Sequence, residues 1–313
     1  MKKYLASLLF FFLFTSPLHA DKLLKSGFLS GEWKLDTNFN INNPADKIII
    51  IYNHGSAEND KPSKDCVWKN NIRNWTLLSK SQVKKKEILV YSLCSDHLGG
   101  DDWKIFWKKK NVQYKGTPKL EKRVQANFDI IEKFINLGVP NNQIFLAGQS
   151  CGGWTTMMFL SKYPNKIAGG ITTEHACYGK LSRKYKVEKV GVDKALKNFK
   201  KKRPVAAFFR SSQIKMISEA KNLPVLIFTH PKDPFDGLLS DWVDNIPGAK
   251  RIVMSENFKI NNKSCKRIGV NNGERWEEPI KARGNSTAHH MSMADCFQYY
   301  NPTILEFIAS KIK

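Results

Sequence analysis

The sequence predicts an α/β fold with a mostly parallel central sheet flanked by helices. Several short apolar runs are continuous rather than alternating, as in strands buried on both faces of a parallel sheet. Segments of helical periodicity lie between these runs. One run, at 144–147, leads through the pentapeptide G-x-S-x-G at 148–152 into an apolar helical segment. This alternation extends over most of the chain.

The expected elements follow in order. An aromatic segment at 21–43 precedes the main sheet and is expected to add one or two antiparallel strands. The main strands are expected at 47–52, 87–93, 144–147, 166–172, 223–229 and 249–255. A helix is expected between Pro118 and Gly138, because Val124, Phe128 and Ile131 recur on one face. Further helices are expected at 155–160 and, starting at the Asn-Pro pair, at 301–312.

The G-x-S-x-G segment sits where a strand turns into a helix. A serine on so tight a turn has strained backbone angles, and glycines at 148 and 152 allow the close approach that the turn requires. Ser150 would then lie at the head of a helix, where a free N–H stabilises negative charge. The competing interpretation is a glycine-rich turn that only packs a helix on a sheet. The G-x-G-x-x-G spacing of dinucleotide-binding folds is absent here.

The N-terminus resembles a secretory signal. Residues 1–20 combine a basic start, an apolar core too short to span a bilayer comfortably, and a small-residue cleavage site before Asp21. No cysteine directly follows that site, so a lipid anchor is not expected there. No later stretch looks transmembrane, so no stable membrane anchor is expected. The prediction is a secreted or periplasmic protein whose mature part, 21–313, forms one domain. A basic segment near 177–222 is expected to be a cap-like insertion.

The formal net charge is +23, and lysine runs occur at 84–86, 108–110 and 200–202. Attraction to an anionic polymer is one interpretation. The favoured interpretation is that these scattered lysines lie on solvated faces, and no nucleic-acid partner is expected. All six cysteines lie in the mature part, and an even number in an exported protein suggests disulfides.

Chain order then suggests a catalytic set. Ser150 follows one strand, Asp233 a later strand, and His289 and His290 precede the last helix. The order Ser…Asp…His is that of the α/β-hydrolase triad. Over residues 45–312 the sequence resembles the α/β-hydrolase superfamily, in particular its esterase and dienelactone-hydrolase-like branches. The resemblance implies an α/β-hydrolase fold.

The resemblance also implies residue roles. Ser150 matches the nucleophile, and Cys151 matches the position of one N–H of the oxyanion hole. The turn at 54–56 matches the segment that supplies the second N–H, with Ser56 preferred over Gly55. Asp233 matches the acid. The competing interpretation is that Asp233 is a turn residue and that Asp236 or Glu174 is the acid. His290 or His289 matches the base. The glycine that usually precedes this histidine is missing, which leaves both open, with His290 preferred. His54 is expected to shape the oxyanion loop.

Three disulfides are proposed from the places of the six cysteines in the expected fold. They join Cys151 to Cys177, Cys265 to Cys296, and Cys66 to Cys94. A free Cys151 acting as the nucleophile is disfavoured, because it lies one residue away from the turn position. The tryptophans at 103, 107 and 154 and Phe106 are candidates for an acyl or sugar pocket or, more commonly, for the core.

The predicted function is hydrolysis of a small-molecule carboxylic ester through an acyl-serine intermediate. No metal or organic cofactor is expected. Two alternatives stay open: acyl transfer to an acceptor other than water, and a non-catalytic exported binding protein on the same fold. The substrate and the oligomeric state do not follow from the sequence.

Overall fold

A computed structural model describes most of the chain. The residues described are 26–29, 35–55, 75–95, 118–254, 258–260, 263–271, 274–280 and 287–312. The segment predicted to be a signal peptide, and Trp103, Phe106 and Trp107, therefore lie outside the described residues. Among the described helices, none combines the length and the apolar character that a membrane span requires.

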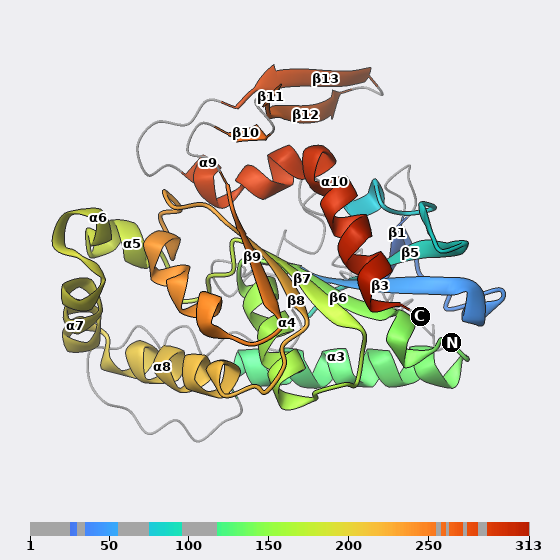
Figure 1. The fold of residues 1–313 in the computed structure, drawn as a ribbon, viewed down its shortest axis with the longest axis horizontal. Helices are drawn as coiled ribbons and strands as arrows, with labels where there is room; N and C mark the ends of the chain where they lie inside the picture. The colour runs from blue at the N-terminus through green and yellow to red at the C-terminus, as the bar shows by residue number, and fades with distance from the viewer. Residues whose placement is uncertain are drawn as a thin grey trace, which may run out of the picture.

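The described residues form a central sheet of nine strands in the order β2-β1-β5-β3-β6-β7-β8-β9, with β4 paired to β5 (Figure 1). Strands β3 and β5 to β9 are parallel, and β1, β2 and β4 are antiparallel. The bounds are β1 Gly27–Leu29, β2 Leu35–Asp36, β3 Lys47–Asn53, β4 Gln82–Val83, β5 Lys86–Leu93, β6 Ile144–Gln149, β7 Gly169–Thr173, β8 Val225–Thr229 and β9 Ala249–Val253. The mostly parallel sheet is confirmed.

Two strands begin later than predicted. The strand expected from 166 begins at Gly169, because the Lys166 N–H bonds back to the Tyr163 carbonyl in the turn that follows the preceding helix. The strand expected from 223 begins at Val225, immediately after Pro224, which has no N–H to donate to a ladder.

Helices cover both faces of the sheet. They are α3 Lys119–Asn136, α4 Cys151–Lys162, α5 Leu181–Lys184, α6 Val187–Val190, α7 Val192–Lys202, α8 Pro204–Ser218, α9 Thr287–His290 and α10 Ser292–Lys311, with 3-10 turns η1 Pro44–Asp46, η4 Asn141–Gln143 and η5 Gly237–Asn245. One hydrophobic cluster joins the sheet to α3, α4 and α8, and a second joins its other face to α10 (Figure 1). Burial on both faces explains why the strands read as continuous apolar runs.

The segment predicted as a cap divides between two places. Helix α8 packs on α4 in the helical layer, with Ala206 and Ile217 fully buried. Helix α5 lies at the carboxyl end of the sheet, beside η5 (Figure 1). This segment therefore both completes the core and borders the end of the sheet where the parallel strands terminate.

The last helix begins nine residues earlier than predicted. We expected it to start at the Asn301-Pro302 pair, but α10 begins at Ser292 and contains Pro302. Proline lacks the N–H for one intrahelical bond and favours a bend, and α10 changes direction along its length (Figure 1). Buried side chains before the proline, among them Cys296 and Phe297, keep this first part of α10 packed on the sheet.

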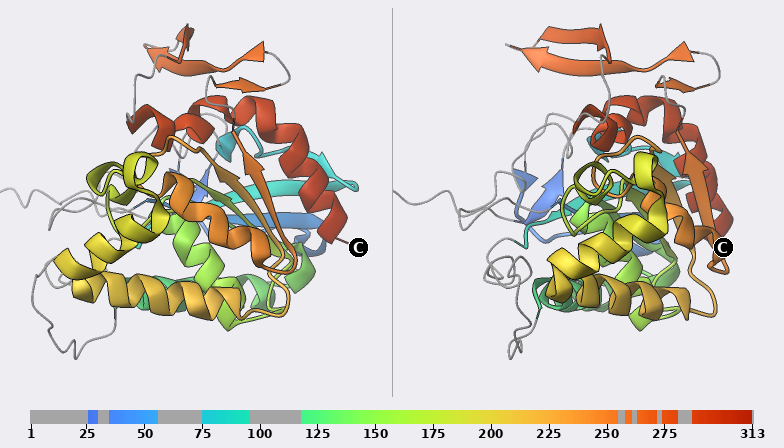
Figure 2. Two further views of the ribbon diagram at one scale, coloured as in Figure 1. Left: turned by 60° about the vertical axis from the view of Figure 1, so that its left-hand side comes forward. Right: turned by 90° about the vertical axis from the view of Figure 1, so that its left-hand side faces the viewer.

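A region expected to be a polar loop contains two short hairpins. Strand β10 Lys259–Ile260 pairs with β11 Lys263–Ser264, and β12 Lys266–Asn271 with β13 Glu274–Pro279. The second hairpin stands apart from the main sheet, beyond α10 (Figure 2). Its sequence signal is the Asn-Gly pair at 272–273, which favours tight hairpin turns.

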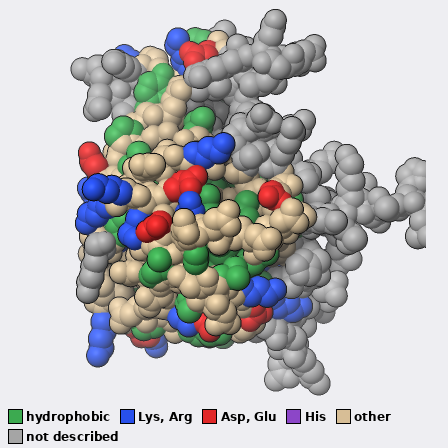
Figure 3. All heavy atoms as spheres, turned by 90° about the vertical axis from the view of Figure 1, so that its right-hand side faces the viewer, with side chains coloured by type: hydrophobic (Ala, Val, Ile, Leu, Met, Phe, Trp, Pro, Cys, Tyr) green, Lys and Arg blue, Asp and Glu red, His purple; other side chains and the backbone are tan. Residues whose placement is uncertain are grey.

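On the face drawn in Figure 3, lysine and arginine side chains lie among aspartate and glutamate side chains. Residues 84–85 and 200–202 are exposed, as expected for lysines on solvated faces. The lysine run at 108–110 lies outside the described residues.

Two of the three proposed disulfides are confirmed. Cys151 is bonded to Cys177 and Cys265 to Cys296, with Cα atoms 4.5 and 5.2 Å apart. The first ties α4 to the loop after β7, and the second ties the hairpin region to α10. Cys94 is also disulfide-bonded. Cys66, its proposed partner, lies outside the described residues.

These disulfides predict the thiol reactivity of the folded protein. Treatment with an alkylating reagent, without a reductant, is expected to leave Cys151, Cys177, Cys265 and Cys296 unmodified in a peptide mass map. After denaturation and reduction the same four should be labelled. Labelling of any of them in the natively folded, unreduced protein would contradict this pairing.

Candidate active site

The turn between β6 and α4 brings backbone segments unusually close together. Ser150 has φ 55° and ψ −123°, a strained conformation for a residue with a side chain. A Cβ on Gly148 would lie 2.3 Å from the Gly152 carbonyl carbon, and a Cβ on Gly152 would lie 2.0 Å from the Asn53 oxygen. Both distances are far below van der Waals contact, so glycine is required at both positions.

Ser150, His290 and Asp233 form one continuous hydrogen-bonded chain. His290 Nε2 lies 2.9 Å from Ser150 Oγ, and its Nδ1 lies 2.9 Å from Asp233 Oδ2. Because an ionised carboxylate only accepts, Nδ1 carries the proton and Nε2 faces the serine hydroxyl as an acceptor. The Ala176 carbonyl, 3.0 Å from Ser150 Oγ, is a second acceptor for the same hydroxyl proton.

Asp233 is held from two sides. It is buried, and its Oδ1 accepts a hydrogen bond of 2.8 Å from the Phe235 N–H. The Asp233 N–H donates to the His230 carbonyl, 3.0 Å away, at the end of β8. The Phe235 ring stacks on the His290 imidazole with centroids 4.0 Å apart. The loop that carries the carboxylate therefore also packs against the histidine.

The two alternative candidates for the acid, Asp236 and Glu174, interact with other side chains. Asp236 Oδ2 accepts from Arg210 Nη2 at 3.3 Å, and both side chains are buried. Burial raises the pKa of Asp236, although Arg210 opposes the shift. Glu174 Oε1 accepts a hydrogen bond of 2.9 Å from Ser292 Oγ at the start of α10.

The two adjacent histidines point to different surroundings. The His289 ring stacks on Phe258, with centroids 5.2 Å apart, and lies 4.6 Å from the His230 ring. Only His290 of this pair bridges Ser150 and Asp233. The described residues contain no group of three or more histidine, cysteine or acidic side chains arranged to hold a metal ion.

The N–H groups beside Ser150 come from two segments. Cys151 is the first residue of α4, so its N–H belongs to the free N-terminus of a helix. Gly55 follows β3, and a Cβ there would lie 3.5 Å from Ser150 Cβ. The β3 loop therefore passes directly over the serine. Ser56, the predicted second donor, lies outside the described residues.

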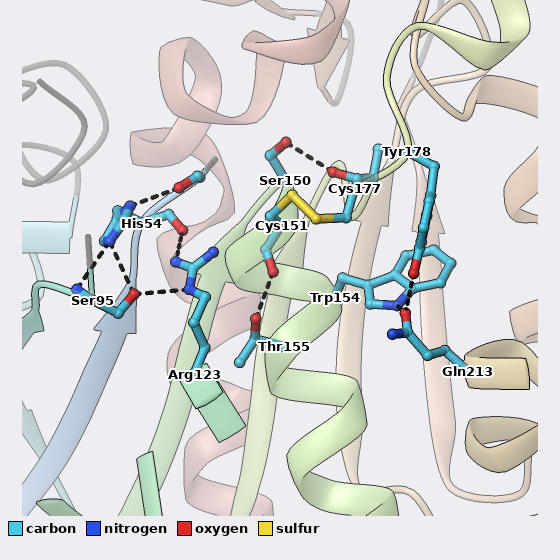
Figure 4. The surroundings of a disulfide bond; sticks show 12 residues. His54, Ser95, Arg123, Ser150, Cys151, Trp154, Thr155, Cys177, Tyr178 and Gln213 are labelled. Atoms are coloured by element: carbon cyan, nitrogen blue, oxygen red, sulfur yellow. Dashed lines mark hydrogen bonds between the residues drawn. A yellow bond between two sulfur atoms is a disulfide. The ribbon is translucent and has the colours of Figure 1, made fainter. Parts of the chain in front are cut away.

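A buried network, which sequence reasoning missed, holds this loop. Arg123 on α3 donates from Nη2 to the His54 carbonyl at 2.5 Å and from Nε to Ser95 Oγ at 2.8 Å (Figure 4). His54 Nε2 accepts from the Ser95 N–H at 3.2 Å, so its proton is on Nδ1, 2.6 Å from the Gly55 carbonyl. Burial and the Arg123 charge hold the pKa of His54 well below its usual value.

A second pair of contacts fixes the end of β3 against α3. The Asn53 and Asn127 amides donate to each other, at 2.9 and 2.8 Å. No periodic signal marks Arg123 or Asn127, because both are polar residues on the buried face of α3. The expected apolar face was correct for Val124 and Ile131, which are fully buried.

Gln149, the residue before the serine, also has a role that the sequence did not indicate. Its Nε2 donates to the His290 carbonyl at 3.2 Å and contacts Met291 Sδ at 3.7 Å. The turn that exposes Ser150 is thereby tied directly to the segment that carries the histidine.

A buried aromatic group lies on the other side of the disulfide (Figure 4). Trp154 Nε1 and the Tyr178 hydroxyl both donate to Gln213 Oε1, at 2.7 and 2.6 Å. Trp154, a candidate pocket residue, is therefore fully buried in the core. His175 packs between Trp154 and Trp242, with centroids 6.2 and 6.0 Å away. Burial, reinforced by the Arg210 charge, lowers the pKa of His175 to about 3.

The sheet order and the turn at Ser150 together decide the fold. Six parallel strands are flanked by antiparallel strands at one edge, and the glycine-bounded serine joins the central strand β6 to a helix, as in a nucleophile elbow. The chain has the α/β-hydrolase fold. The resemblance found in the sequence is confirmed at this level, and nothing specifically supports the dienelactone-hydrolase-like branch.

No protein-family model and no curated protein matches the chain. Similar solved structures include an acetyl xylan esterase from Paenibacillus sp. R4, with 8% identity and a TM-score of 0.47, covering 87% of this chain and 77% of that one. The carboxylesterase EstE1, cloned from a metagenomic library, has 13% identity and a TM-score of 0.47, and the match covers 85% of this chain and 80% of that one. MenH from S. aureus has 13% identity and a TM-score of 0.41, and the match covers 91% of this chain and 98% of that one.

The buried His175 predicts a loss of stability in acid. Its pKa of about 3 in the folded protein lies below the value of 6.5 for an unperturbed histidine. Below pH 6.5 the unfolded chain therefore binds a proton that the folded chain does not, and stability falls as the pH is lowered. Between pH 7 and pH 5 this one group should remove about 2 kcal/mol from the free energy of unfolding.

Urea denaturation at both pH values tests this expectation. His175→Phe keeps a ring at the position but cannot bind the proton, so its unfolding free energy should change with pH by about 2 kcal/mol less than that of the wild type. An identical pH dependence in the two proteins would refute the assignment.

Proposed function

We propose that this protein is an exported serine hydrolase that cleaves carboxylic esters through an acyl-serine intermediate. The observation that carries the proposal is the hydrogen-bonded chain from Ser150 through His290 to Asp233, placed on the strained turn between β6 and α4. A serine hydroxyl is a poor nucleophile at neutral pH and needs an imidazole within hydrogen-bond reach. The carboxylate orients that imidazole and stabilises its charged form.

In the acylation step, Ser150 Oγ attacks the ester carbonyl carbon while its proton moves to His290 Nε2. The carbonyl oxygen takes the negative charge, and the N–H of Cys151 donates to it, together with an N–H of the β3 loop, for which Ser56 is our candidate. When the intermediate collapses, the bond to the leaving alkoxide breaks. His290 returns its proton to that oxygen, so an alcohol departs and the acyl-serine remains.

In the deacylation step, a water molecule attacks the acyl carbon and His290 Nε2 takes one of its protons. The second tetrahedral intermediate expels Ser150 Oγ, which recovers the proton from the imidazolium. The products are a carboxylic acid and the free enzyme. The Ala176 carbonyl would hold the serine hydroxyl before each cycle, because it accepts the same proton at 3.0 Å.

Two alternatives are judged against this proposal. Acyl transfer would use the same first step and replace water with another acceptor. A non-catalytic binding protein would have no need for a strained serine aligned with a histidine and a carboxylate. Export is part of the proposal because Cys151, Cys177, Cys265 and Cys296 are paired, and disulfides persist in oxidising compartments.

Replacement of the nucleophile and of each histidine tests the proposal. Ser150→Ala should lower turnover of p-nitrophenyl esters by several orders of magnitude and abolish labelling by a fluorophosphonate probe. His290→Ala should cause a loss of similar size, whereas His289→Ala should retain measurable turnover because its ring lies against Phe258. An Ser150→Ala enzyme with most of its activity would exclude the mechanism.

The two aspartates should separate activity from stability. Asp233→Asn should lower turnover strongly with little change in melting temperature, because an amide does not stabilise the imidazolium. Asp236→Asn leaves the Arg210 charge buried without a carboxylate, so it should destabilise the fold by about 3 kcal/mol. Its turnover per folded molecule should be affected much less.

Both variants would be compared by thermal melting and by active-site titration with the phosphonate probe, which counts folded, competent enzyme. Equal loss of turnover per titrated site in the two variants would mean that the acid is wrongly assigned.

A further inference from the structure

We infer that the substrates of this site carry a negatively charged group next to the ester bond, and that Lys180 binds it. This inference rests on the proposed function and adds to it the chemical class of the substrate. Lys180 precedes helix α5 and is partly exposed. Its side chain ends in one ammonium group, which lies next to the Phe235 ring.

The loop that carries the acid fixes the position of Lys180. The Ser182 N–H donates to the Phe235 carbonyl at 2.7 Å, and the Arg183 N–H donates to the Pro234 carbonyl at 3.0 Å. The start of α5 is thereby attached to the residues that directly follow Asp233. Lys180 is consequently placed by the active-site loop itself rather than by a distant part of the surface.

An aromatic ring connects the ammonium to the histidine. Lys180 Nζ lies 5.6 Å from the centre of the Phe235 ring, within the range of a cation–π contact. The same ring stacks on His290 at 4.0 Å. The ammonium is therefore separated from the imidazole by no more than one aromatic ring, a distance that the non-reacting part of a small ester spans.

The described carboxylates of the site are engaged elsewhere. Asp233 bonds to His290, Asp236 pairs with Arg210, and Glu174 accepts from Ser292. Within the part of the chain that the structure describes, no acidic side chain lies within ion-pair distance of Lys180. A carboxylate or phosphate on the substrate would be its anionic partner.

An anionic substrate would also be drawn toward the protein by its excess of basic residues, which gives the sequence a net charge of +23.

Two matched pairs of esters test the inference on either side of the scissile bond. Mono-p-nitrophenyl glutarate and p-nitrophenyl valerate differ by a carboxylate on the acyl group. 4-Acetoxybenzoate and 4-acetoxybenzamide differ by a carboxylate on the leaving group. The readout is the ratio of kcat/KM for the anionic ester to that for its neutral partner, in the wild type and in variants.

In at least one pair the ratio should fall about fivefold to tenfold in Lys180→Met, the size expected for one partly exposed ion pair. Lys180→Arg should restore most of the ratio, since it keeps the charge. Lys189→Met, a substitution of an exposed lysine on neighbouring α6, is the matched control and should leave the ratio unchanged. Added salt should lower the ratio more in the wild type than in Lys180→Met, which keeps only the attraction from the other basic residues.

The outcomes distinguish the two proposals. If the phosphonate probe labels Ser150 and esters are cleaved, but Lys180→Met leaves both ratios unchanged, the inference about Lys180 is wrong and the proposed function stands. If the wild type neither cleaves any of the four esters nor reacts with the probe, the proposed function fails and the inference fails with it.

Discussion

The close contact between Gly152 and the end of β3 determines the geometry around Ser150. A Cβ at this position would lie 2.0 Å from the Asn53 oxygen, so even a methyl group would force α4 away from the sheet. The strained backbone of Ser150 persists because the strand before it and the helix after it are both buried and leave no alternative path. The contact also brings the loop after β3 over the serine, where a Cβ on Gly55 would lie 3.5 Å from Ser150 Cβ.

The other site segments are positioned from this same turn. Gln149 bonds to the His290 carbonyl, Ser150 bonds to the Ala176 carbonyl, and Cys151 is covalently joined to Cys177. Three consecutive residues thus each fix a different contact with the surrounding segments. Such an arrangement limits independent movement of the histidine loop and of the loop after β7, and a preorganised site needs that restriction.

The sequence predicted the parts of this structure that depend on local chemistry. Continuous apolar runs gave the parallel strands, and the glycines around Ser150 gave the turn, because each reflects a steric requirement visible in a few adjacent residues. The predicted start of the last helix was wrong because burial of Cys296 and Phe297 against the sheet outweighs the local cost of Pro302 inside α10. Tertiary packing of this kind leaves no short-range signal.

The residues that hold the site in place were invisible for a related reason. Arg123 and Gln149 act through backbone carbonyls that are 69 and 141 residues away in the chain. Arg123 belongs to no motif, Gln149 occupies a variable position of G-x-S-x-G, and both are residue types that are common on protein surfaces. Only the assembled fold brings these donors to their acceptors, so pattern reasoning identified the reacting groups but not the groups that position them.

Two buried arginines also narrow the choice of the proposed base among the histidines. Arg123 lies beside His54 and Arg210 near His175, and in both cases the positive charge adds to burial in lowering the pKa of the histidine. Neither imidazole can readily take a proton. His290 differs from both because its Nδ1 faces the Asp233 carboxylate and its Nε2 faces Ser150 Oγ, each at 2.9 Å. The lowered pKa values of His54 and His175 therefore argue against either as the base, and they support the same choice as the hydrogen bonds of His290.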